Sequence, residues 1–191
     1  MIGKSNDFKK FYFFAINFQQ KPLLKKRKMC DNIRYGRGCI SHKKMEEHRG
    51  MLKGIPKILS PELLKVLAEM GHGDEIVIAD GNFPAEAYGK RVIRADGHGG
   101  AQMLDAVLSV IPLDTYAAEN FLLMQIVPGD DVKPTIWDEY RKIAASKDPN
   151  VKEGSLERFA FYERAKQAFA VIATGEEAIY ANIILKKGVI K

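Results

Sequence analysis

The sequence predicts an α/β fold, built as a single domain in which helices cover both faces of a β-sheet. The chain of 191 residues is long enough for one domain with a substantial core and short for two. Short, wholly apolar β-branched runs are typical of strands buried on both faces. Amphipathic stretches with a helical period lie between those runs. Together these observations indicate a covered sheet.

The first helix and the first strand have the clearest signals. Ser60-Pro61-Glu62 offers a side-chain cap, a proline at the first helical position and an acid in the first turn. A 3.6-residue apolar period follows, and we expect Gly71 to end the helix in the left-handed conformation. Ile76 to Ala79 then predicts a buried strand, which Asp80 ends.

The remaining elements follow from the same reasoning. We expect helices at residues 102–111, 135–146 and 161–169, and strands at 121–127, 170–174 and 179–185. Gly175 stops the strand at 170–174.

Residues 1–50 differ from the rest of the chain. They hold 13 basic and 4 acidic side chains, a net charge of +9, whereas residues 51–191 hold 17 basic and 20 acidic side chains, a net charge of −3. No sustained period runs through residues 1–50. We therefore interpret them as a disordered or non-native leader and residues 51–191 as the functional domain. The alternative is a basic arm that binds nucleic acid.

Composition also excludes several classes of function. Cys30 and Cys39 both lie in the leader, so the domain is neither built on disulfides nor equipped with a cysteine nucleophile. The longest apolar run near the start, Phe11 to Ile16, is too short to span a bilayer, and no signal-peptide cleavage pattern follows it. We predict a cytoplasmic protein. HExxH, CxxC and P-loop motifs are missing, so the sequence predicts no metal site.

His72 is the leading candidate for chemistry because it lies in a flexible joint, Gly71-His72-Gly73, directly after a helix. The partial negative charge of the last helical carbonyls favours a protonated ring, which would make His72 a proton donor near neutral pH. The alternative is a hydrogen-bonded turn residue. Asp74 either orients the ring or caps the turn.

Three further polar side chains are candidates for a ligand site. Asp80 follows a buried strand, where open α/β sheets place ligand-binding groups, although it also suits the start of a turn. Tyr180 and Asn182 are two residues apart on an expected strand, so they point to one face and Ala181 to the other. They suit either a wall that binds a polyol or the surface of an edge strand.

Arg158 lies in Glu157-Arg-Phe-Ala-Phe161, where strand-like alternation would direct it away from Phe159 and Phe161. A surface ion pair is the ordinary role of a single arginine. Taken together, the His, Asp, Tyr, Arg and Asn set suits the transfer of protons on a polar small molecule.

Six segments in order extend this reading: MLKGIPKILSPELLKVLAEMGHGDEIVIAD, NFPA, VIRADG, PLDTY, RFAFYERAKQAFAVIATGE and YANIILKKGV. Over residues 51–191 they resemble the L-fucose mutarotases of the FucU/RbsD family. The resemblance implies a mixed β-sheet flanked by helices and a cofactor-free isomerase that interconverts α- and β-L-fucose. It also implies that translation begins at Met51, since the family usually opens with Met-Leu-Lys.

The resemblance assigns roles to the candidate residues. His72 matches the catalytic histidine, and Asp80, Arg158 and the segment Tyr180-Ala181-Asn182 match the sugar-binding groups. The family forms homo-oligomers, from dimers to decameric rings, so we expect this chain to associate with copies of itself. We expect it to bind L-fucose and to bind neither nucleic acid nor membrane. A straight strand from Asp74 to Asp80 spans roughly 20 Å. Either the joint folds back over the strand, or a neighbouring subunit completes the site.

Two alternatives stay open at this point. Tyr-Ala-Asn is frequent in the D-ribose pyranases of the sister branch, where the fucose branch more usually has Tyr-Gly-Asn. Arg158 and its FAFYERA context follow the fucose branch instead, and we give that longer motif more weight. A non-catalytic sugar-binding protein would keep Asp80, Arg158 and Asn182 but would have no need for His72 in its joint.

Overall fold

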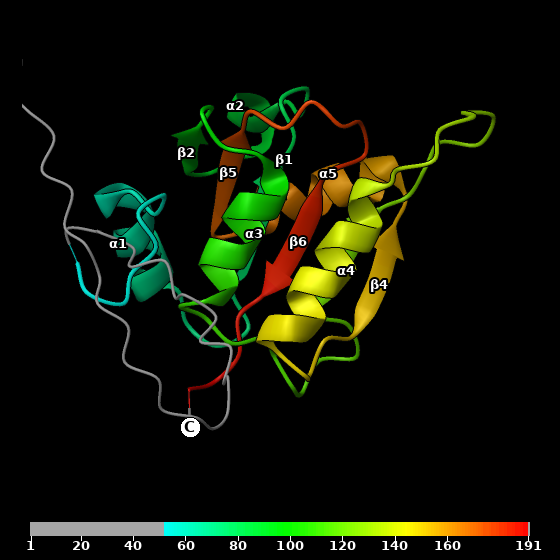
Figure 1. Ribbon diagram of the computed structural model, residues 1–191. Coiled ribbons are helices and arrows are strands. Elements are labelled where there is room, and N and C mark those ends of the chain that lie inside the picture. Colours follow the sequence, from blue (N-terminus) through cyan, green and yellow to red (C-terminus); the bar gives the residue numbers. More distant parts are fainter. Residues whose placement is uncertain (1–51, 191) are drawn as a thin grey trace, which may run out of the picture. The chain divides into compact units, whose positions relative to one another are not determined.

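The protein is seen in a computed structural model that describes residues 52–190, and the predicted leader, residues 1–50, lies outside them. The described part contains one six-stranded sheet with the order β2-β5-β1-β6-β3-β4 (Figure 1). In chain order, the strands are β1 (Glu75–Ala79), β2 (Val92–Ala95), β3 (Phe121–Met124), β4 (Glu153–Leu156), β5 (Ala170–Thr174) and β6 (Ile183–Lys186). The helices are α1 (Pro61–Glu69), α2 (Ala85–Tyr88), α3 (Gly100–Leu108), α4 (Ile136–Lys147) and α5 (Arg158–Gln167).

The sheet is mixed, as the resemblance implied. Strands β2, β5 and β1 are parallel to one another, and so are β3 and β4. β6 joins these two groups by pairing antiparallel with β1 and with β3. The start of β1 therefore lies beside the end of β6, and the end of β1 lies beside the start of β6.

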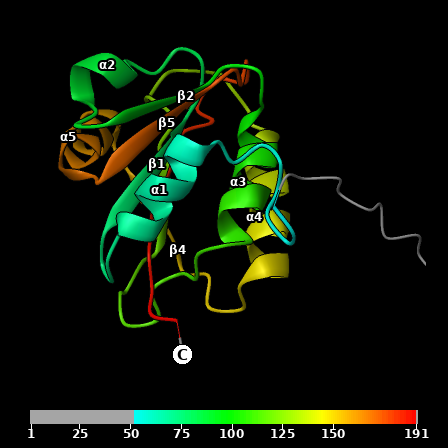
Figure 2. The ribbon, with the colours of Figure 1, turned by 90° about the vertical axis from the view of Figure 1, so that its left-hand side faces the viewer.

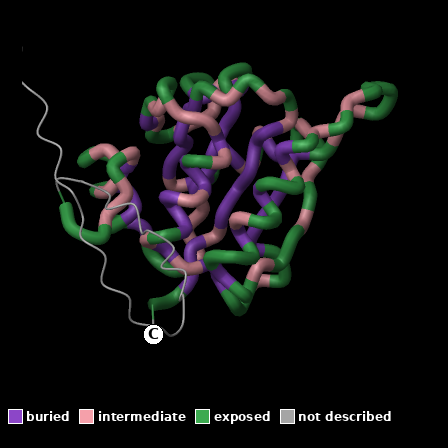
Figure 3. Tube along the Cα trace, in the orientation of Figure 1, coloured by how far each residue is buried: buried purple, intermediate pink, exposed green. Residues whose placement is uncertain are grey.

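Helices cover both faces of the sheet, which confirms the predicted α/β class. Figure 2 shows α3 and α4 on one side and α2 and α5 on the other. Strand alternation divides the core accordingly: Ile76 and Ile78 pack with α1, α3 and α4, whereas Val77 and Ala79 pack with α2 and α5. All four side chains are 0–1% exposed, and burial runs through the central strands in Figure 3. Within residues 52–190, no helix has the length and apolar character needed to cross a bilayer.

The first helix begins as predicted and ends differently. Ser60 caps it by accepting the Leu63 N–H at 3.1 Å. The expected left-handed cap at Gly71 is wrong, because the left-handed glycine of this joint is Gly73, with φ at +86°. The chain leaves α1 through Met70 in an extended conformation, and the ammonium of Lys187 binds the last carbonyls of the helix.

Two other local expectations are wrong. Tyr180 and Asn182 precede β6 in an irregular segment, where Tyr180 has a positive φ of 60°, so strand alternation does not place their side chains. Arg158 opens α5 and is not in an extended segment. The helix begins there because the Glu157 carboxylate accepts the N–H groups of Phe159 and Ala160.

Candidate active site

His72 lies in the joint between α1 and β1 with its ring half exposed: 47% of the side-chain surface is accessible. The neighbouring Gly73 donates its N–H to the Lys187 carbonyl at 2.9 Å, which ties the joint to the end of β6. The positive φ of Gly73 is one that residues with a Cβ rarely adopt, so glycine is needed at this position. The joint thus holds an exposed imidazole on a fixed backbone.

Asp114 is the carboxylate partner of His72. Nε2 of His72 is 3.1 Å from Oδ1 of Asp114, whose side chain is only 6% exposed. The same oxygen accepts the Tyr116 N–H at 2.9 Å. Burial by itself would raise the pKa of Asp114, but the Tyr116 N–H, the hydrogen bond and charge of His72 and the nearby Lys186 together hold that pKa below its usual value. Asp114 therefore faces the imidazole as an anion.

Tyr116 completes this first cluster. Its ring meets the His72 ring edge-on, with centroids 5.7 Å apart, and the side chain is 71% exposed. Asp74, for which two roles were open, accepts the Gly71 N–H at 2.7 Å and so caps the turn. We name His72, Asp114 and Tyr116 the histidine cluster.

Asp80 and Asn182 form a buried pair at the other end of β1. The Asp80 carboxylate accepts a hydrogen bond from the side-chain Nδ2 of Asn182 at 2.7 Å, and the Asp80 backbone N–H donates to the side-chain Oδ1 of Asn182 at 2.9 Å. The second carboxylate oxygen accepts the Asn82 N–H at 3.0 Å, which gives Asp80 the turn-starting role as well. Burial raises the pKa of Asp80, although the Asn82 amide and Asn182 oppose this effect.

The segment that carries Tyr180 and Ala181 is held by α4. Trp137 donates its indole N–H to the Tyr180 carbonyl at 2.8 Å, and the Tyr140 hydroxyl donates to the Ala181 carbonyl at 3.0 Å. The Tyr180 hydroxyl accepts the Val127 N–H and donates to Asp130. Ala181 is 1% exposed, and its backbone is one of the groups that oppose the rise in the pKa of Asp80.

Arg158 lies beside the same group of residues. Its charge acts on the hydroxyls of Tyr162 and Tyr180, and the charge of Asp80 also reaches Tyr162. The guanidinium stacks on the exposed ring of Phe159, with Cζ 4.6 Å from the ring centroid. Its Nε is buried and has no hydrogen-bond partner within the described structure. A buried donor without a partner is costly, so this nitrogen is left unsatisfied in the single chain. We name Asp80, Arg158, Tyr180 and Asn182 the polyol cluster.

The two clusters lie at opposite ends of the central strand β1. β1 runs as a regular strand from the histidine cluster to Asp80, a separation on the order of 20 Å. β6 runs the other way beside it in Figure 1, so Asn182 meets Asp80 and Lys186 lies near the histidine end. The joint does not fold back over β1, because the Gly73–Lys187 bond continues the β1–β6 ladder. The structure thus joins four predicted residues in one place and leaves His72 in another.

Comparison with known proteins places this fold. A sequence model described as the RbsD / FucU transport protein family matches residues 53–190. The chain belongs to this family.

Relatives within the family carry informative names. A fucose mutarotase of Danio rerio is 54% identical over an alignment of 148 residues, which covers 73% of this chain and 95% of the relative. The crystal structure of a fucose mutarotase from Streptococcus pneumoniae in complex with L-fucose is 48% identical, with a TM-score of 0.70, and covers 73% of this chain and all of that one. FucU from Bifidobacterium longum is 60% identical, with a TM-score of 0.71 and the same coverage.

Two residues of the histidine cluster were not predicted as site residues, although they lie in a segment that carries the family resemblance. Asp114 and Tyr116 lie in the segment PLDTY, 42 and 44 residues after His72. No local spacing connects them to the histidine. A carboxylate two residues before an aromatic, following an apolar segment, was the only available signal, and it is weak.

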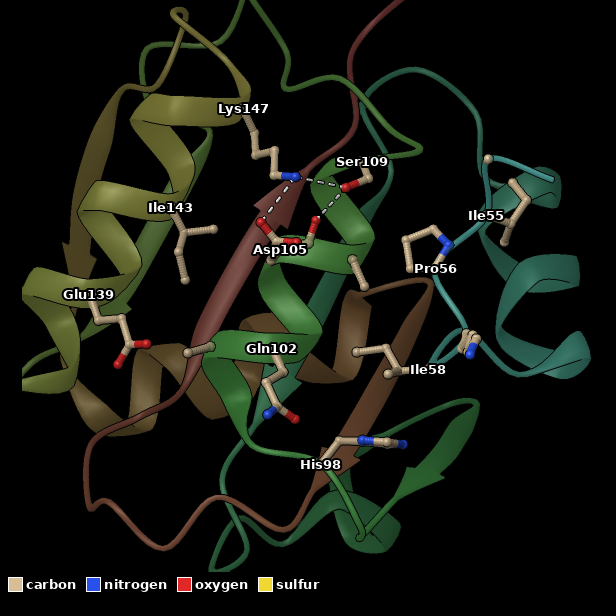
Figure 4. A pocket seen from close by; sticks show the side chains of 14 residues that line it. Ile55, Pro56, Ile58, His98, Gln102, Asp105, Ser109, Glu139, Ile143 and Lys147 are labelled. Carbon is tan, nitrogen blue, oxygen red and sulfur yellow. Dashed lines mark hydrogen bonds and ion pairs between the residues drawn. The ribbon is translucent and has the colours of Figure 1, made fainter. Parts of the chain in front are cut away.

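A separate hollow of about 790 Å³ lies between residues 54–58, α3 and α4 (Figure 4). Lys147 on its rim pairs with Asp105 at 3.0 Å and donates to Ser109 at 3.1 Å. Among the described residues, none of the site residues predicted from the sequence lines this hollow. The same part of the chain has no group of three His, Cys, Asp or Glu side chains that could hold a metal ion.

Proposed function

We propose that the chain is an L-fucose mutarotase, an isomerase that interconverts the α and β anomers of L-fucose. Relatives named fucose mutarotase share about half of its residues over nearly their whole length, and one of them is seen with L-fucose bound. The observation in this chain that carries the chemistry is the His72–Asp114 pair.

That pair suits the opening of a pyranose ring. Opening needs one proton delivered to the ring oxygen and another removed from the anomeric hydroxyl; the aldehyde then turns and recloses. An exposed imidazole can give and take a proton near neutral pH, and a carboxylate behind it stabilises the protonated form. Both steps are proton transfers, so we propose that the reaction uses no cofactor.

The polyol cluster supplies the groups that we propose to bind the sugar. The carboxylate of Asp80 and the amide of Asn182 are held in place by each other, so each presents a fixed direction to a hydroxyl group. Arg158 supplies a positive charge beside these groups, and the hydroxyl of Tyr180 lies within reach of that charge. Fixed donors and acceptors of this kind orient a polyol without taking part in proton transfer.

We propose that the complete site forms between two copies of the chain, in a homo-oligomer of up to ten subunits. One sugar cannot reach both clusters of the same copy, since β1 separates them. Exposed apolar side chains lie at both clusters: Tyr116 is 71% exposed, Phe159 60% and Ile179 47%. Apolar groups grouped beside a polar site are typical of a surface that a partner covers.

Saturation-transfer NMR on L-fucose and on D-ribose tests this function. Irradiation of the α-anomer signal should reduce the β-anomer signal of L-fucose far above the uncatalysed rate. Faster exchange of D-ribose would move the chain to the pyranase branch. Binding of L-fucose with no exchange would instead indicate a sugar-binding protein.

A further inference from the structure

The C-terminus of α1 is capped by a distant lysine. The helix has no basic residue in its last turn, and no left-handed glycine follows it directly. Lys187 fills this role from the end of the sheet: its Nζ donates to the Leu67 carbonyl at 2.9 Å and to the Met70 carbonyl at 2.5 Å. The residue is only 9% exposed, and no carboxylate within the described chain pairs with it. Its charge is therefore directed at the helix end.

The backbone around Lys187 joins the two halves of the His72–Asp114 pair. On one side Lys187 accepts the Gly73 N–H and donates to the Asp74 carbonyl, both at 2.9 Å. On the other side Lys186 accepts the Asp114 N–H at 3.0 Å, and Gly188 donates to the Pro112 carbonyl at 2.9 Å. A single three-residue segment thus sets the spacing between the imidazole and its carboxylate.

Gly188 allows this close approach. A Cβ at that position would lie 2.3 Å from the Leu113 carbonyl oxygen, a distance that side chains do not tolerate. The backbone before Asp114 can therefore lie against the segment that holds Lys187.

This arrangement also changes the electrostatics at His72. The carbonyls at the end of α1 carry a partial negative charge that would favour a protonated imidazole in the joint. The ammonium of Lys187 lies on two of those carbonyls and offsets that charge. The carboxylate of Asp114 lies directly against the ring of His72, at 3.1 Å.

We propose that Lys187 is a positioning residue for His72, which fixes the joint by capping α1 and by holding the Asp114 backbone against the joint. The proposal rests on the proposed function, in which His72 moves the proton. Lys187 itself points to the helix end and does not touch the sugar.

A matched pair of variants tests the proposal in the assembled protein. Lys187→Met keeps the aliphatic stem and removes the ammonium. Lys90→Met is the control, because Lys90 also donates to the last carbonyl of a helix, that of Gln167 in α5, at 3.2 Å, but is exposed to solvent, whereas Lys187 is buried. We expect Lys187→Met to lower L-fucose exchange at saturating sugar by about 10- to 100-fold, with little change in the sugar concentration at half-saturation. Lys90→Met should stay within a factor of about two of the unmodified chain.

A spectroscopic measurement separates positioning from a general loss of structure. The ring signals of His72 report its place against the edge of Tyr116. They should shift or broaden in Lys187→Met, while methyl signals of core residues such as Ile78 stay in place. Unchanged ring signals together with unchanged exchange in Lys187→Met would overturn the proposal. If the unmodified chain exchanges no sugar but the ring signals still move, the proposed function fails and the positioning role stands.

A third measurement does not depend on the folding of Lys187→Met. A buried ammonium that is bound to two carbonyls exchanges its protons slowly, so the unmodified chain should show a protected lysine ammonium signal in ¹H–¹⁵N spectra. Lys187→Arg keeps a cation with several donors; it should remove that signal and retain more exchange than Lys187→Met. A spectrum of the unmodified chain without any protected ammonium would contradict the cap.

Discussion

Asn182 and Asp80 exchange two hydrogen bonds across the boundary between β1 and β6, although 102 residues separate them. The side-chain amide of Asn182 faces a carboxylate whose pKa is already raised, chiefly by burial. A second carboxylate at position 182 would place two like charges within hydrogen-bond distance.

Asn182→Asp is therefore expected to lower the free energy of unfolding at neutral pH by about 2–4 kcal/mol. Urea unfolding measures the change, and part of the loss should disappear in acid as one carboxyl takes up a proton. Asn150→Asp is the control, because Asn150 also donates its side-chain amide to an aspartate, Asp148, at 2.9 Å, but is itself exposed. Equal losses in the two variants would contradict the special role of burial.

Replacing His72 should abolish most of the catalysis. We expect His72→Gln to reduce L-fucose exchange by roughly 100-fold or more, the usual scale for a general acid or base. His98→Gln is a close control, since His98 also lies between two glycines but lines the separate hollow. Saturation-transfer NMR measures both, and full activity in His72→Gln would remove this residue from the mechanism.

Asp114 should make stability depend on pH in a defined direction. Its folded-state pKa is lowered, so the unfolded chain binds the proton more tightly between that pKa and the ordinary value of 3.8. The stabilisation by Asp114 is complete above pH 3.8 and is lost as pH falls through the folded-state pKa. Asp114→Asn lacks this contribution, so its deficit against the unmodified chain should be larger at pH 6 than at pH 3.

Thermal unfolding at the two pH values measures this difference. The exposed Asp131 provides the control, because Asp131→Asn removes the same charge from a solvated loop. A deficit of Asp114→Asn that does not change with pH would show that the Tyr116 N–H, His72 and Lys186 do not hold the pKa of the carboxyl below its usual value.

A mixing experiment tests whether two copies share a site. His72→Gln and Arg158→Ala should each be nearly inactive alone. After joint unfolding and refolding in equal amounts, about a quarter of the sites would combine an intact His72 from one copy with an intact Arg158 from its neighbour. Recovery of exchange to that level supports a shared site, and a mixture that stays inactive contradicts it. A mixture of two different His72 variants is the negative control, because none of its sites contains an intact His72.

Removal of residues 1–50 should leave exchange and thermal stability unchanged. Both clusters and both halves of the core lie within residues 52–190. A shortened chain that loses activity would show that the leader contributes to the assembled site. Salt-dependent binding of nucleic acid by the full chain alone would favour the basic-arm alternative.

Much of the fold could be predicted because its central elements have strong local signals. The Ser60 cap and the apolar runs of β1 and β5 fix those elements without tertiary help. β4 was missed because its sequence, Glu-Gly-Ser-Leu, lies at the sheet edge and alternates between exposed and half-buried residues. An edge strand needs no apolar run, so pairing with β3 decides its structure.

The site was harder to predict than the fold. Residues that follow strand ends, such as Asp80, can be predicted as site residues, because the ends of neighbouring strands lie side by side. The partner of His72 could not be found in this way, since the contact with Asp114 depends on the packing of β6 against two distant segments. Asp74 was the nearer carboxylate in sequence, but its hydrogen bond to Gly71 turns it towards the backbone.

The central position of β6 in the sheet has a consequence for folding during synthesis on the ribosome. It is the last strand along the chain, yet it lies between β1 and β3 and joins two groups of strands that otherwise have no common neighbour. Until β6 emerges, β1 and β3 each present an unpaired, apolar edge to the cell. The sheet can therefore close only after β6 has been synthesised, and until then the free edges of β1 and β3 are sites where another chain could pair.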